Sequence, residues 1–178
     1  MAVMQIVYGL DQIFFKKANL VTIFDDNLKK LANDMVSTMT YENALGIGAN
    51  MVGVLQRIIV VKNEKDHNNH FIMVNPRITE VSSESVNFEE GSLSFPGIKA
   101  KISRPKSITV EFQDLNENTQ ILKADELLAR VIQHEIDYLN GKTIFDHVSK
   151  LKKDSMIKKM NKHMEKYKPH VHTSSCRH

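Results

Sequence analysis

One stretch of the sequence, residues 125–141, restricts the possible fold more than any other. Its apolar residues recur with a helical period, and Gly141 follows them where glycine commonly ends a helix. On this helix Glu135 falls on the apolar stripe, so we expect its carboxyl group to be largely buried. A buried carboxylate costs stability unless it is paired or takes part in chemistry. The stretch therefore predicts a core helix that carries a polar network or a catalytic group.

The patterns that precede this helix predict one further helix and several strands. Residues 25–39 predict a helix capped by aspartate. Buried or half-buried strands are predicted at residues 58–61, 71–74 and 108–112. The second of these strands is expected to end at Asn75-Pro76, because proline cannot donate to a strand ladder. Strands first and a long helix late indicate one α+β domain with mostly antiparallel pairing.

Composition restricts the class of protein and its compartment. With 178 residues, 42% of them apolar and 25% charged, the chain is typical of a single globular domain. Its one cysteine, Cys176, excludes an internal disulfide. The first residues lack the pattern of a secretory signal, and no segment is long and apolar enough to span a membrane. We therefore expect a cytoplasmic protein that has neither a membrane nor DNA as a partner.

The dipeptide His134-Glu135 on the predicted helix has two interpretations. It is half of the zinc-hydrolase signature His-Glu-x-x-His, in which the histidines bind metal and the glutamate acts as a base. The position of the second histidine is Tyr138, so the signature is broken. Alternatively, Glu135 accepts hydrogen bonds in a structural network and His134 is a core histidine with a partner of its own.

Three segments of the sequence, taken together, resemble the peptide deformylases, metalloenzymes that remove the formyl group from nascent N-terminal methionine. Gln133–Gly141 resembles the family motif Gln-His-Glu-x-Asp-His-Leu-x-Gly, and Glu90–Ser94 resembles Glu-Gly-Cys-Leu-Ser. Gly46–Gly53 sits where Gly-x-Gly-Leu-Ala-Ala-x-Gln is expected. The likeness covers about residues 4–160, in order and with the family spacing. It implies antiparallel sheets around a central helix that carries the His-Glu motif, plus a C-terminal helix.

The resemblance also implies a metal site, and most of its ligands are replaced. The family holds its metal, Fe²⁺ or another divalent transition metal, with one cysteine and two histidines. Ser92 stands at the cysteine position and Tyr138 at the second histidine position, which leaves His134 as the one inherited ligand. Neutral hydroxyl groups are poor ligands for such a metal. No bound cofactor is therefore expected.

The remaining family positions are partly kept. Glu135 occupies the general acid/base position, and the backbone amide of Leu93 occupies the position that helps stabilise an oxyanion. Gly53 replaces the glutamine that polarises the substrate carbonyl, and Asn50 and Met51 replace two small alanines, so we expect their side chains partly to fill the pocket. The retained substrate-pocket positions are Gly46, Gly48, Glu90 and Gly91.

Magnitudes predict that these replacements abolish the reaction. Metal lowers the pKa of bound water from about 15.7 to about 7, so its loss removes at most about 12 kcal/mol, at about 1.36 kcal/mol per pKa unit. Glu135 acting alone as a base recovers about 3 to 5 kcal/mol. The loss of the carbonyl-polarising donor at Gly53 costs about 3 to 4 kcal/mol more. We therefore hypothesise a pseudoenzyme that retains formyl-methionyl peptides as ligands.

A working hydrolase is the alternative hypothesis. It would recruit an unusual metal set, or use Ser92 as a nucleophile with His134 as its base. The sequence shows no acid that would orient His134 for this role. The competing interpretation is that Ser92, His134 and Tyr138 hydrogen bond to one another in place of the ion.

The C-terminal part divides into a basic helix and a tail. Residues 1–149 form the deformylase-like domain, and residues 150–168 carry eight lysines beside the methionine stripe of an amphipathic helix. The lysines form either a solvated face or an electrostatic contact to RNA, and for this family the ribosome is the expected partner. Residues 169–178 are expected to be a disordered tail. The stripe is Met156, Met160, Met164 and Tyr167.

Overall fold

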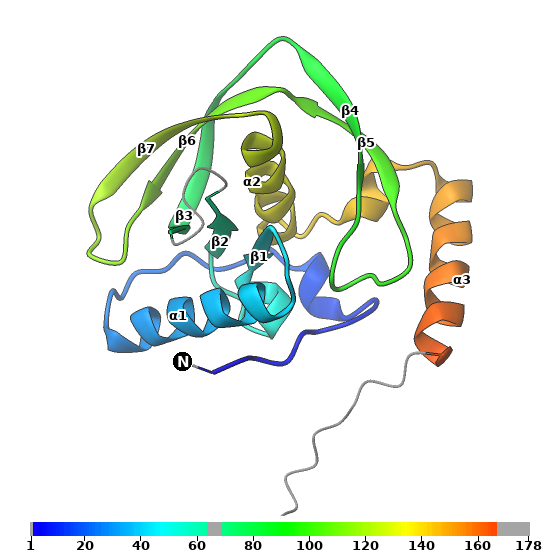
Figure 1. Ribbon diagram of the computed structural model, residues 1–178, viewed down its shortest axis with the longest axis horizontal. Coiled ribbons are helices and arrows are strands. Elements are labelled where there is room, and N and C mark those ends of the chain that lie inside the picture. The colour runs from blue at the N-terminus through cyan, green and yellow to red at the C-terminus, as the bar shows by residue number, and fades with distance from the viewer. Residues whose placement is uncertain (1, 64–68, 167–178) are drawn as a thin grey trace, which may run out of the picture.

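The computed structural model describes residues 2–63 and 69–166. Figure 1 shows the helix α2 at the centre, with a five-stranded sheet on one side and the two-stranded β4–β5 sheet on the other. All of the paired strands are antiparallel, which confirms the predicted α+β class. The elements in chain order are η1 (Gln12–Phe15), α1 (Asp26–Tyr41), β1 (Gly46–Gly48), η2 (Ala49–Val52), β2 (Ile58–Lys62), β3 (His70–Val81), β4 (Ser85–Glu90), β5 (Ala100–Pro105), β6 (Ser107–Gln113), β7 (Thr119–Asp125), α2 (Glu126–Leu139), η3 (Ile144–His147) and α3 (Lys150–Lys166).

Helix α2 is the core element that the sequence predicted. Ala129, Ile132 and Leu139 on its apolar stripe are fully buried. Each large side chain of this kind contributes about 1.5–3 kcal/mol through burial. The helix ends where predicted, because Gly141 adopts the left-handed conformation with φ 74°. Glu135 on the same stripe is only 3% exposed, so the predicted burial of its carboxyl group is confirmed.

The five-stranded sheet has the order β1-β2-β3-β6-β7. The prediction that the strand at residues 71–74 ends at Asn75-Pro76 is wrong, because β3 continues to Val81. A register shift between Val74 and Arg77 absorbs the missing N–H of proline as a bulge. Asn75 stabilises the bulge with φ 53° and with side-chain hydrogen bonds to Val21 and Gln113. Strand β3 therefore bends at the bulge and continues beyond Pro76.

Helix α3 covers the end of the molecule beside the loop that follows β4 (Figure 1). Met156 and Met160 are buried in the main core, while Lys158, Lys159 and Lys162 are exposed. Tyr167 and the tail at residues 169–178 lie outside the described residues. Among the described residues, no helix combines the length and hydrophobicity required to cross a membrane.

Candidate functional site

A cavity of about 350 Å³ lies between β1, the end of β4 and helix α2. Its wall is mostly apolar, and its polar groups come from the two segments that contain Ser92 and His134. Of the expected substrate-pocket positions, Gly46, Glu90 and Gly91 line the cavity, whereas Gly48 does not. The residues that line it are Ala44, Leu45, Gly46, Met51, Phe88, Glu89, Glu90, Gly91, Ser92, Leu93, Leu127, Arg130, Val131, His134 and Glu135.

The glycines of β1 let this strand pack directly on α2. A Cβ atom at Gly46 would lie 2.6 Å from Cγ1 of Val131 and 3.0 Å from Oε1 of Glu135. A Cβ atom at Gly48 would lie 3.4 Å from Oε2 of Glu135. Larger residues here would push β1 away from the helix. Both glycines therefore hold the cavity's floor in place, although only Gly46 reaches its surface.

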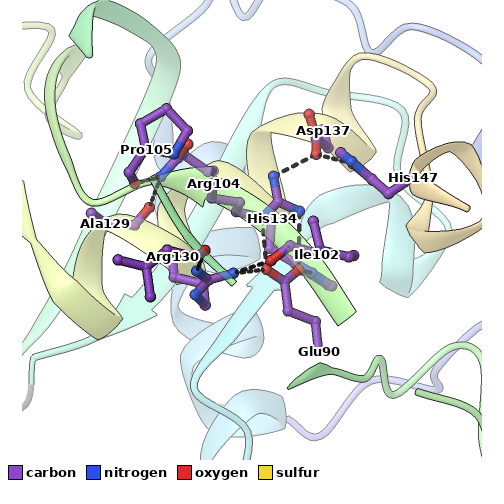
Figure 2. A network of polar contacts seen from close by, with 11 residues as sticks. Glu90, Ile102, Arg104, Pro105, Ala129, Arg130, His134, Asp137 and His147 are labelled. Carbon is purple, nitrogen blue, oxygen red and sulfur yellow. Dashed lines mark hydrogen bonds and ion pairs between the residues drawn. The ribbon is translucent and has the colours of Figure 1, made fainter. Parts of the chain in front are cut away.

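Glu90 is the centre of a buried ion-pair network (Figure 2). Its carboxylate accepts from Nε of Arg104 at 2.7 Å, from Nη1 of Arg130 at 2.6 Å and from Nδ1 of His134 at 2.9 Å. Burial alone would raise the pKa of Glu90, but the bonds from His134 and Arg104 outweigh it and lower the pKa to about 2. Glu90 is therefore ionised at neutral pH and fixes the ring of His134.

The same network ties α2 to the neighbouring elements. Arg104 on β5 donates to Oδ2 of Asp137 at 2.7 Å, and His147 of η3 contacts the same oxygen at 2.9 Å. Because the ionised carboxylate of Glu90 can only accept, Nδ1 of His134 donates to it, which fixes the orientation of the ring. Sequence reasoning missed this orienting acid, because it assigned Glu90 to the substrate pocket. The one available signal was the position of Glu90 two residues before Ser92.

Glu135 lies in a very different environment. Its Oε2 atom is buried and has no hydrogen-bond partner among the described residues. Burial raises the pKa of Glu135 to about 7, although the nearby charges of His134 and Arg104 and the backbone N–H of Gly48 oppose the rise. The interpretation of Glu135 as a structural hydrogen-bond acceptor has one contact in its favour, the backbone N–H of Gly48. The centre of the ion-pair network is Glu90.

Tyr138 is enclosed by aromatic rings and is only 1% exposed. Its ring stacks on that of His134, with centroids 5.0 Å apart, and meets the ring of Phe95 at 5.9 Å. Burial raises the pKa of the Tyr138 phenol well above its usual value, and the adjacent Ser92 hydroxyl only partly offsets this. The Ser92 hydroxyl itself accepts from the backbone N–H of Ser94 at 3.3 Å.

These residues do not fit a divalent transition metal. The phenol of Tyr138 stays neutral because its pKa is raised, and a serine hydroxyl is neutral as well. His134 is then the single strong ligand of the three positions. In the part of the chain that the structure describes, no group of three or more histidine, cysteine, aspartate or glutamate residues could hold a metal ion. A catalytic zinc site normally needs three such ligands and one open position.

The first family segment departs most from expectation. Met51 lines the cavity as expected, but Asn50 turns away and donates to the backbone carbonyl of Tyr138 at 2.8 Å. The expectation that Asn50 partly fills the pocket is thus wrong. Gly53 ends η2 with φ 81°, is exposed and lies outside the cavity lining. Leu93 does line the cavity, next to Ser92.

Comparison with known proteins agrees with the fold described above. The family described as "Polypeptide deformylase" matches residues 3–154. A "Peptide deformylase-like" protein of Rickettsia conorii is 50% identical over 175 residues, covering 98% of this chain and 96% of the relative. A peptide deformylase of Wolbachia pipientis wMel is 42% identical, covering 94% and 99%. The crystal structure of peptide deformylase from Ehrlichia chaffeensis in complex with actinonin is 38% identical, with a TM-score of 0.86 and coverage of 92% and 98%.

Proposed function

Because the chain belongs to the polypeptide deformylase family, we propose that it is a non-catalytic member that binds N-terminal methionyl peptides in the cavity beside α2. One observation carries the proposal. The cavity and the Glu90 network remain in place, while the groups at the ligand positions, Ser92 and Tyr138, are neutral hydroxyls. A protein built this way keeps a pocket for the substrate without the means to activate water.

The form of the cavity supports a peptide as the ligand. A volume of about 350 Å³ is near the lower end of the range for small-molecule pockets, and its wall is largely apolar, as an unbranched side chain such as methionine requires. Strand β1 is an edge strand of the five-stranded sheet and contributes Gly46 to the cavity. An extended peptide can add to such an edge through backbone hydrogen bonds.

The basic face of α3 supports a second part of the proposal, attachment to the ribosome in the cytoplasm. The buried methionines Met156 and Met160 fix which face of α3 points inward. The exposed lysines on the other side can neutralise RNA phosphates, and such binding weakens steeply with salt. Co-sedimentation with ribosomes that disappears at moderate salt is the expected result. Co-sedimentation that is unchanged after removal of residues 150–178 would exclude α3 as the contact.

The hydrolase alternative has one observation in its favour. Glu90 orients His134 through Nδ1, which supplies the acid that a Ser-His pair needs. The Ser92 hydroxyl, however, accepts a hydrogen bond from the backbone of Ser94 and lies beside Tyr138. We therefore favour the binding function. Labelling of Ser92 by an acylating serine probe, absent in Ser92→Ala, would reverse this preference.

Metal analysis together with an activity assay tests the proposal. Untagged protein should contain far less than one equivalent of iron, nickel or zinc, and should not hydrolyse formyl-Met-Ala above background. Calorimetry should nevertheless detect a methionyl peptide in the cavity, and Gly46→Val should weaken its binding because the new side chain enters the floor. Stoichiometric metal with ordinary turnover would refute the non-catalytic assignment.

A further inference from the structure

We propose that the cavity prefers a first side chain that is unbranched and carries a neutral oxygen acceptor, as in methionine sulfoxide, over methionine itself. This inference rests on the peptide-binding function proposed above and specifies the chemical class of its ligand. Arg130 carries the argument, because it brings a guanidinium group to a cavity whose wall is otherwise mostly apolar. The specificity-determining residue is therefore Arg130.

Arg130 belongs to the apolar part of the lining. Leu127 and Val131 of the same helix line the cavity, as do Met51 and Leu93 from other segments. Arg130 is only 8% exposed, so each of its N–H groups needs an acceptor to offset the loss of water. Among the described residues that line the cavity, it is the one whose side chain is positively charged at every physiological pH.

The guanidinium group is held in one position from several sides. Its Nη1 atom donates to Oε1 of Glu90 at 2.6 Å and to the backbone carbonyl of Ile102 at 3.2 Å, as Figure 2 shows. Its Nη2 atom donates to the backbone carbonyl of Val86. The ring of Phe88, which also lines the cavity, has its centroid 5.5 Å from Cζ of Arg130. A donor fixed in this way is already oriented before a ligand arrives.

The Nε–H group of Arg130 remains for a ligand. A guanidinium has five N–H groups, and the contacts above use those of Nη1 and one of Nη2. Nε donates to no described residue, yet it is not one of the buried side-chain atoms that lack a partner, so it reaches accessible surface. The side chain of Arg130 is only 10% exposed and lines the cavity, so we assign this accessible N–H group to the cavity wall.

The charges around the cavity favour a neutral acceptor over an anion. Glu89 and Glu90 both line the cavity, and the charge of Arg130 is already paired with Glu90. A ligand carboxylate would therefore meet negative charges without gaining an unpaired cation. A sulfoxide oxygen accepts a hydrogen bond without adding a charge, and the rest of the side chain stays apolar and unbranched. A volume of about 350 Å³ suits one such side chain with a short length of backbone.

Calorimetry with four peptides tests the inference on the unmodified protein. The peptides are formyl-Met-Ala-Ser, its norleucine analogue, and the two sulfoxide epimers of formyl-Met-Ala-Ser. One epimer should bind at least about tenfold more tightly than the methionine peptide, as expected for a hydrogen bond from a charged donor. The epimers should differ because oxidised sulfur is chiral and the donor is fixed. Norleucine, which has no acceptor, should bind about as well as methionine.

Two outcomes contradict the proposals in different ways. A wall without a free donor would leave the sulfoxide oxygen unpaired, so both epimers would bind more weakly than methionine. A gain of less than about threefold for the better epimer, or any loss for both, would overturn the preference and leave peptide binding intact. Binding of none of the four peptides would refute both the preference and the peptide-binding function.

Variants assign the preference to Arg130. Arg130→Met removes the donor and keeps an unbranched side chain, so the sulfoxide peptide should then bind more weakly than the methionine peptide. Arg130→Lys keeps the charge beside Glu90 but lacks the fixed Nε–H group, so the two epimers should bind within about twofold of each other. Arg77→Met removes an arginine from an exposed ion pair on β3 and should keep the full preference. Circular dichroism confirms that the variants are folded. A preference that survives in Arg130→Met or Arg130→Lys would contradict the inference.

Discussion

Two neighbouring regions of the site differ in how far their buried polar groups are hydrogen bonded. In the network around Glu90, the arginines, His134 and Asp137 are joined by ion pairs and hydrogen bonds of 2.6 to 3.0 Å. Next to this network, the buried atoms Oδ1 of Asn50, Oε2 of Glu135 and the hydroxyl of Tyr138 make no hydrogen bond of good geometry among the described residues. In the first region the buried charged groups pair with one another, whereas in the second region these buried polar atoms lack well-formed hydrogen bonds.

This difference separates the residues that hold the site's elements together from the residues at the family's metal-ligand positions. The Glu90 network joins β4, β5, α2 and η3, so the fold depends on it. Ser92 and Tyr138 are not members of this network, so the residue types at these two positions leave its ion pairs intact. Loss of one partner in the network leaves a buried charge, which is expensive. Loss of an uncharged group such as the Tyr138 hydroxyl leaves no buried charge without a partner.

The largest expected effect is the return of metal binding when ligands are added to the intact frame. Ser92→Cys combined with Tyr138→His should restore one equivalent of zinc or iron, because Glu90 already orients His134 as a supporting partner orients a metal ligand. Structural zinc sites contribute about 10–16 kcal/mol, so the gain should be stoichiometric in elemental analysis. A Gly53→Gln change is best left out, because φ 81° strains any residue with a Cβ atom.

The control for this experiment is the same double substitution together with Glu90→Gln. If the network supports the ligand as proposed, the triple variant should bind metal at least about tenfold more weakly, the range found for such supporting partners. Equal metal content in the two variants would show that Glu90 does not strengthen metal binding by His134. Failure of both would show that the rings of residues 134 and 138, stacked at 5.0 Å, cannot be brought to one ion.

The sequence predicted the helices and strands better than the side-chain contacts between them. Helix α2 was predictable because a long amphipathic period and a terminal glycine are local signals. The continuation of β3 through Pro76 was not, because the bulge depends on Asn75 contacting Val21 and Gln113. The role of Glu90 was hidden for a similar reason, since it reaches His134 across 44 residues and only after β4 pairs with β5. The burial of Glu135 could be predicted, whereas its lack of a partner could not.

Breaking the network should produce the second largest effect. Glu90→Gln leaves Arg104 and Arg130 buried without their carboxylate, and should lower the free energy of unfolding by about 3–5 kcal/mol. Urea denaturation monitored by circular dichroism measures this. The matched control is Glu89→Gln, whose pair with Lys99 is about two-thirds exposed on both sides and should change stability by less than about 0.5 kcal/mol. Similar losses in the two variants would contradict the contrast between the regions.

The two carboxylates should also respond to pH in opposite directions. The pKa of Glu90 is lowered from 4.5 to about 2, so its stabilisation is present above about pH 4.5 and is lost as the pH falls toward 2. The pKa of Glu135 is raised from 4.5 to about 7, so the folded state holds its proton more tightly. That contribution is complete below about pH 4.5 and is lost as the pH rises through 7, by up to about 3 kcal/mol.

Urea denaturation from pH 2 to 8 tests this prediction. Stability should pass through a maximum near pH 4.5 to 5 as far as these two groups decide it. Glu135→Gln should remove the fall between pH 4.5 and 7 and should be the more stable protein at pH 8. A wild type and a Glu135→Gln variant with parallel profiles in that window would show that the carboxyl group is not held neutral by burial.

The smallest expected effect is the loss of the Tyr138 hydroxyl. Because this buried group has no hydrogen-bond partner of good geometry among the described residues, Tyr138→Phe should change the free energy of unfolding by less than about 1 kcal/mol and can even raise it. The ring contacts with Phe95 and His134 are retained, so the packing is unchanged. Tyr138→Ala removes them as well and should cost about 3–5 kcal/mol. A loss of 2 kcal/mol or more in Tyr138→Phe would mean that the hydroxyl is a structural member of the site, and the centre would then follow the same rule as the network around Glu90.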